Sequence, residues 1–195
     1  MGDDDGLARR CNMKVLAIMG SPRLGGNSDV LLNEAIQGAK AAGATVDKVN
    51  LIDLGREMCV ACHSCIQKAE CVHDKRTNEV LQKIKTAHGL ILSTPVWSMS
   101  MSSYMKAFMD HWGVFMNPDY TSRIPGKRVG FIAVCASPDR NYSIPAIKHM
   151  EECARFFRMR VKGKVAVKGY GAAGEVSKDK KAMAAAFRVG KAVAS

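Results

Sequence analysis

Residues 20–28 form a glycine-rich stretch whose composition suits the binding of an anion. An apolar run over 15–19 precedes this stretch and a helical pattern begins near Asp29, so the predicted order is strand, turn and helix. Such a turn directs backbone N–H groups and the positive end of the helix at a phosphate group. The side chains that could add hydrogen bonds are Ser21, Arg23, Asn27 and Ser28.

Two common phosphate-binding motifs do not fit this stretch. A P-loop needs lysine where Gly26 stands, and the dinucleotide motif G-x-G-x-x-G needs glycine where Pro22 stands. One arginine among hydroxyl and amide groups suits a single terminal phosphate, such as that of FMN. The alternative interpretation is a glycine-rich turn that binds no ligand.

Four of the seven cysteines follow the pattern C-x2-C-x2-C-x5-C, at Cys59, Cys62, Cys65 and Cys71. Thiolates at these spacings can surround one iron–sulfur cluster. The pattern is similar to the bacterial ferredoxin run, except that five residues precede the last cysteine and no proline follows it. Zinc sites usually join two short cysteine motifs that lie farther apart. A cluster is therefore favoured, while zinc and a loop of free thiols remain alternatives.

The other cysteines stand alone, and we expect Cys11, Cys135 and Cys153 to lie in a tail or in the core. His63 and His73 flank the cysteine pattern. We interpret both histidines as solvated neighbours of the pattern.

Strand and helix patterns alternate along the chain, which favours a doubly wound parallel sheet. Strands are expected at 13–19, 45–50, 90–92, 128–135 and 161–168, and helices at 28–42, 79–86, 103–116, 144–157 and 178–193. A cysteine-rich insertion over about 51–78 interrupts this rhythm. Five strands in the flavodoxin-like order 2-1-3-4-5 would bring together three polar loops, 20–28, 94–102 and 136–143.

With 195 residues, the chain is expected to form one domain over 13–195, preceded by a disordered tail over 1–12. No apolar run approaches the roughly 20 residues of a membrane span, and the first residues lack a signal-peptide pattern. The net charge of +11 makes nucleic acid a partner to consider, but the basic residues are spread along the chain without a recognised motif. We therefore expect a cytoplasmic protein that binds neither nucleic acid nor a membrane.

Three stretches resemble the NADPH-dependent FMN reductase family of flavodoxin-like proteins. They are Gly20-Ser-Pro-Arg-x-x-Gly-Asn-Ser28, Pro95-Val96-Trp97 and Lys106-Ala-Phe-Met-Asp110. Within that family, the cysteine pattern is similar to that of the iron–sulfur flavoproteins, in which it binds a [4Fe–4S] cluster near the flavin. The resemblance covers residues 13–193 and implies an FMN-dependent oxidoreductase.

The resemblance also implies roles for particular residues. The phosphate of FMN would be held by Ser21, Arg23, Asn27 and Ser28, and the flavin ring would lie along Pro95, Val96, Trp97, Ser98 and Met99, with Ser137 nearby. Electrons would come from NAD(P)H or a ferredoxin-like donor, and the chain would form a homodimer or homotetramer. The alternatives are a non-enzymatic electron carrier like flavodoxin and a reductase of FMN or quinone without a cluster.

Overall fold

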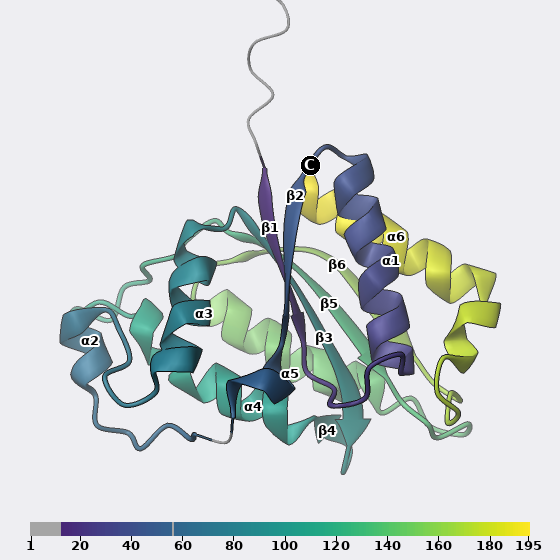
Figure 1. Cartoon of the computed structure of the whole chain (residues 1–195), viewed down its shortest axis with the longest axis horizontal. Helices are drawn as coiled ribbons and strands as arrows, with labels where there is room; N and C mark the ends of the chain where they lie inside the picture. The colour runs from purple at the N-terminus through teal and green to yellow at the C-terminus, as the bar shows by residue number, and fades with distance from the viewer. Residues whose placement is uncertain (1–12, 56) are drawn as a thin grey trace, which may run out of the picture.

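The computed structural model describes residues 13–55 and 57–195, so the predicted tail and Cys11 lie outside the described residues. In this part of the chain, five parallel strands form a sheet in the order β2-β1-β3-β5-β6 (Figure 1). They are β1 (Lys14–Met19), β2 (Thr45–Asn50), β3 (Gly89–Trp97), β5 (Arg128–Val134) and β6 (Arg160–Val167). A short strand, β4 (Ser100–Met101), pairs with β3. Without β4, the order is the predicted 2-1-3-4-5, which is confirmed.

Helices cover both faces of this sheet (Figure 1). One face carries α1 (Asn27–Ala41) and α6 (Lys180–Ala194), and the other carries α3 (Lys75–Thr86), α4 (Ser103–Asp110) and α5 (Ser143–Phe156). Along β1, Val15 and Ala17 join the core beneath α1 and α6, while Leu16 and Ile18 join the opposite core. This alternation explains why the strand reads as a continuous apolar run.

Short helices complete the connections. They are η1 (Leu51–Leu54), α2 (Ser64–Lys68), η2 (His111–Phe115) and η3 (Glu175–Lys178). The predicted helix over 103–116 is therefore α4 followed by the tighter turns of η2. No helix among the described residues is long and apolar enough to span a membrane.

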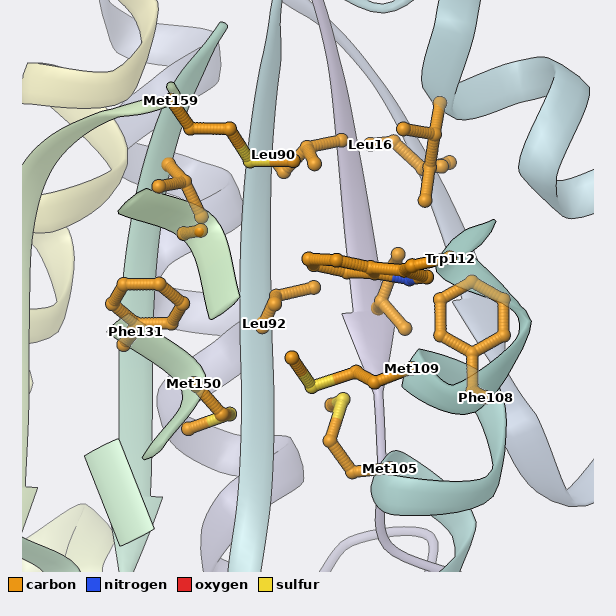
Figure 2. Packing of buried hydrophobic residues seen from close by; sticks show 14 of the residues in the cluster. Leu16, Leu90, Leu92, Met105, Phe108, Met109, Trp112, Phe131, Met150 and Met159 are labelled. Atoms are coloured by element: carbon orange, nitrogen blue, oxygen red, sulfur yellow. The ribbon is translucent and has the colours of Figure 1, made fainter. Parts of the chain in front are cut away.

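The core beneath α4 is built around Trp112 of η2. Its indole is 2% exposed and lies among Leu16, Leu90, Leu92 and Met109 (Figure 2). The rings of Phe115 and Phe157 approach it edge-on, each with its centroid 5.9 Å away. These contacts fix η2 against the sheet.

The structure corrects two expectations about single segments. Strand β3 continues through Pro95–Trp97 into a hairpin with β4, where a loop was expected, because Val96 and Trp97 pair with Met101 and Ser100. Cys153 is exposed on α5 and so is neither a tail nor a core residue, whereas Cys135 is buried.

Helices α1 and α6 approach each other closely at two glycines. A Cβ atom added at Gly190 would lie 1.7 Å from the carbonyl oxygen of Ala35, and one at Gly38 would lie 2.0 Å from that of Phe187. Backbone atoms cannot move aside as flexible side chains can. The two helices therefore need glycine at both positions.

Replacing Gly190 with Ala is expected to lower the free energy of unfolding by about 3 kcal/mol, because overpacking forces the helices apart. Chemical denaturation followed by circular dichroism measures the change. Gly171→Ala is the control, since a Cβ atom there meets open space, and it should change stability by less than about 0.5 kcal/mol. Equal stability of the two variants would contradict the proposed close contact.

Candidate functional site

The turn after β1 presents free backbone donors at the start of α1. Gly26 is the N-cap of this helix and supplies no side chain, and Gly25 has a φ of +72° in the left-handed region. Among the described residues, nothing accepts a hydrogen bond from the N–H groups of Asn27 or Ser28. Together with the positive helix end, these two groups can bind an anion.

The acidic side chain beside this turn does not oppose an anion. Asp29 accepts a hydrogen bond from the Gly25 N–H at 2.8 Å, and its carboxylate also pairs with the ammonium group of Lys48. The pair neutralises the Asp29 charge and fixes the shape of the turn. The guanidinium group of Arg23 makes no hydrogen bond or ion pair with another described residue and is available for a ligand.

The side chain of Asn27 binds the protein itself. Its amide nitrogen donates to the carbonyl oxygens of Tyr170 and Ala172, at 3.2 and 2.8 Å, and its oxygen accepts from the N–H of Val176 at 3.0 Å. Asn27 therefore holds the segment after β6 against the turn and offers a ligand its backbone N–H. Ser21 Oγ accepts from the Arg23 N–H at 3.1 Å, which shapes the turn from within.

Four segments meet around one cavity at the carboxyl edge of the sheet. Seven of the predicted ligand residues line it, namely Ser21, Arg23, Asn27, Ser28, Pro95, Val96 and Trp97. Val134 and Ala136 line it from the end of β5. Sequence reasoning missed the fourth segment, from which Tyr170, Gly171 and Ala173 line the cavity; the glycines there indicated only a flexible turn.

Three predicted residues do not line this cavity. Ser98 faces a neighbouring groove between α4 and α5, Met99 is 62% exposed, and Ser137 accepts a hydrogen bond from the Arg140 N–H at 3.3 Å. Ser98 and Met99 form the turn of the hairpin, with φ values of +46° and +65°. This turn directs both residues away from the cavity.

The hairpin that carries Trp97 is fixed to the turn between β1 and α1. Ser102 Oγ donates to the carbonyl oxygen of Gly20 at 2.5 Å and accepts from the Met105 N–H at 3.2 Å. The Ser102 N–H donates to Thr94 Oγ1 at 3.0 Å. Trp97 packs edge-on against Tyr104, with the ring centroids 6.1 Å apart, and remains 39% exposed. An indole is thus held at the mouth of the cavity.

A second cavity lies under the cysteine-rich insertion. Cys59, Cys62, Cys65 and Cys71 all line it, together with three histidines, His63, His73 and His111. His63 and His73 are exposed, as expected, whereas His111 was not singled out in the sequence because it follows a helical pattern. Among the described residues, no three Cys, His, Asp or Glu side chains are arranged to hold a metal ion. The four thiols therefore share a cavity without forming a metal site as they stand.

Local contacts distinguish the thiols of the insertion. Hydrogen bonds from the backbone and side chain of Ser64 hold the pKa of Cys62 below its usual value, which favours a thiolate there. Burial raises the pKa of Cys65, and the nearby Cys59 and Cys62 raise it further. Both effects favour the neutral thiol at Cys65.

The scaffold holds this insertion through carbonyl groups. The guanidinium of Arg123 donates to the carbonyl oxygens of Cys65, Ile66 and Val114, at 3.3, 2.5 and 3.0 Å. Helix α3 contributes Gln82 and Lys85, which both donate to the carbonyl oxygen of Ala69. The cysteine-bearing backbone is thereby fixed independently of any metal.

Comparison with known proteins places the chain in a described family. The model of the NADPH-dependent FMN reductase family matches residues 13–172. An iron-sulfur flavoprotein of Methanocaldococcus jannaschii is 35% identical over 98 residues, which make up 50% of this chain and 51% of that protein. The match thus spans about half the length of that relative.

Two further similarities extend over most of the chain. A Bacillus subtilis protein, provisionally named as an NAD(P)H-dependent FMN-containing oxidoreductase, is 28% identical over 91% of this chain and 96% of its own length. A solved structure described as a flavone reductase has a TM-score of 0.71 at 22% identity, and the match covers 93% of this chain and 62% of that one. At this identity, the structural match shows a shared fold alone.

Proposed function

The chain belongs to the NADPH-dependent FMN reductase family, and on that basis we propose that it is an FMN-dependent oxidoreductase that takes electrons from NAD(P)H. The observation that supports this proposal most is the cavity at the edge of the sheet. Its lining combines the free N–H groups of Asn27 and Ser28, the free guanidinium of Arg23 and the indole of Trp97. This donor set suits a ligand with an anionic end and an aromatic end.

In this proposal, the residues of the turn hold the phosphate of FMN. Arg23 supplies a full charge, and the backbone at Asn27 and Ser28 supplies two aligned donors. Tyr170 stays neutral beside them, because its hydrogen bond to the Asp179 carboxylate raises the pKa of its phenol to about 12. The nearby carboxylates of Asp29 and Asp179 both have partners, so neither presents an unpaired negative charge to the phosphate.

The hairpin residues orient the aromatic end of the ligand. Pro95 and Val96 present apolar surface, and Trp97 shields one side from water. FMN supplies, when bound, the ability to accept a hydride and to release electrons singly. The protein would contribute by holding the ring near Trp97, a lining residue of the cavity that is partly exposed to solvent, so that a nicotinamide could approach it.

We further propose that the four cysteines hold a [4Fe–4S] cluster. Two observations support this: all four thiols line one cavity, and a relative is named an iron-sulfur flavoprotein. The cluster would supply one-electron transfer to a protein acceptor. A loop of free thiols and a zinc site are the competing outcomes, which differ from it in iron and sulfide content.

One observation favours a second candidate function, that of an electron carrier like flavodoxin. The net charge of +11 favours an acidic protein partner, such as a ferredoxin-like donor. A carrier would receive electrons from that protein and would not react with a nicotinamide.

Anaerobic mixing of the FMN-loaded protein with NADPH, and separately with NADH, distinguishes the two functions. We expect at least one nicotinamide to bleach the visible flavin absorption directly, much faster than it bleaches free FMN at the same concentration. In the proposed complex the cavity holds the flavin in a fixed orientation toward the nicotinamide. Free FMN in solution has no such fixed orientation. Bleaching by a reduced ferredoxin, with no reaction toward either nicotinamide, would support the carrier and contradict the reductase.

A further inference from the structure

A buried histidine beside the cysteines lacks a hydrogen-bond partner. Among the described residues, His111 Nδ1 is one of a few buried side-chain nitrogen or oxygen atoms that are unpaired. The residue is 4% exposed, and its side chain lines the same cavity as the four cysteines. An unpaired buried polar atom is costly, so a group in this cavity that bonded to the His111 ring would offset part of that cost.

The backbone holds this histidine in place. The next residue, Trp112, is locked in the core by Phe115 and Phe157. Helix η2 also packs directly on the insertion, because a Cβ atom added at Gly113 would lie 3.2 Å from Cys65 Sγ. The backbone at His111 is therefore held next to the cysteine-bearing insertion.

Burial of His111 disfavours a positive charge on its ring. Burial lowers the pKa of the imidazole, and this outweighs the opposing effect of the Asp74 and Asp110 carboxylates. A neutral imidazole carries one N–H donor and one acceptor. Since an imidazole carries at least one N–H donor in either protonation state, a ring that lines this cavity can donate a hydrogen bond into it.

We propose that His111 donates a hydrogen bond to a sulfur atom of the iron–sulfur group held by the four cysteines, and so acts as a positioning residue for that group. This inference rests on the cluster part of the proposed function. Hydrogen bonds to cluster sulfurs stabilise the more negative, reduced form and raise the reduction potential. His63 and His73 line the same cavity, but both are exposed and can bond to water instead.

The test compares His111→Leu, which removes the donor, with His111→Gln, which keeps one. Each protein is loaded with ferrous iron and sulfide under anaerobic conditions, and iron content and midpoint potential are measured. We expect both variants to hold as much iron as the unmodified protein. The midpoint potential of the iron–sulfur group should be clearly lower in His111→Leu than in the unmodified protein. In His111→Gln it should recover much of that difference.

His73→Leu is the matched control, and its potential should change far less, because water already competes for that ring. Bound FMN and the melting temperature show whether each variant is folded. An unchanged potential in folded, iron-loaded His111→Leu would overturn the inference. Loss of iron from both His111 variants would overturn it too, because His111 would then be a ligand.

A failure of the proposed function looks different. If the unmodified protein takes up no iron or sulfide, the cluster is refuted before any variant is compared. The FMN site is unaffected by that result, since its cavity shares no lining residue with the cysteine cavity.

Discussion

Replacing Cys65 with Ala is expected to remove essentially all iron and acid-labile sulfide from anaerobically purified protein, while FMN stays bound. Three thiolates leave one iron of a four-iron cluster without its protein ligand. The flavin should stay bound because no cysteine of the insertion lines the cavity at the carboxyl edge of the sheet. Iron and sulfide analysis, with the visible spectrum, measures both effects in one sample. The same loss is expected for Cys59→Ala, Cys62→Ala and Cys71→Ala.

Cysteines outside the insertion provide the controls. Cys153→Ala is the closest match, since Cys153 is an exposed thiol on a different element, and Cys135→Ala and Cys11→Ala extend the set. All three should keep their full iron content. Equal iron in Cys65→Ala and in Cys153→Ala would exclude a ligand role for Cys65 and leave the insertion as a loop of free thiols.

Replacing Arg23 with Ala is expected to weaken FMN binding by about tenfold to a hundredfold, because a hydrogen bond to a charged group contributes about 1.5–3 kcal/mol. Riboflavin, which lacks the phosphate, should bind almost as well as before. Fluorescence titration of both flavins measures the two effects. The guanidinium makes no hydrogen bond or ion pair with another residue in the described part of the chain, so the fold should not suffer.

Two further variants sharpen this prediction. Arg23→Lys keeps the charge and should recover part of the affinity, although it loses the planar fork of donors. Arg188→Ala removes an exposed charge from α6 and should leave both affinities unchanged. Parallel losses of FMN and riboflavin in Arg23→Ala would show that Arg23 supports the turn rather than the phosphate.

The strands and their order were predictable because β1 and β5 are apolar on both faces, which only a central parallel strand tolerates. The glycine-rich turn between β1 and α1 was predictable for a similar reason, since its glycines follow an apolar strand and precede a helical pattern. The apolar strand pattern and the glycine-rich turn are both visible in short stretches of the sequence. These parts of the site could therefore be read without tertiary information.

Other features depend on contacts between distant residues, which local sequence does not show. The hairpin was missed because Pro95 and the serines that follow it are typical of a loop. The role of Asn27 depends on carbonyl groups more than a hundred residues away. His111 was missed because it occupies a helical pattern, and only packing reveals that it reaches the cysteines.

The close contact of α1 with α6 has a consequence for the chain as it leaves the ribosome. A nascent chain that has been synthesised only through β6 already has every strand of the parallel sheet. However, Ile132 and Val165 share a buried cluster with Val189 of α6, so we expect this side of the sheet to lack part of its cover until α6 is made. Apolar residues of α1 such as Leu31 also lack part of their cover. Until α6 is synthesised and Gly190 packs against Ala35, the apolar surface that α6 covers is a target for chaperones and a risk for aggregation.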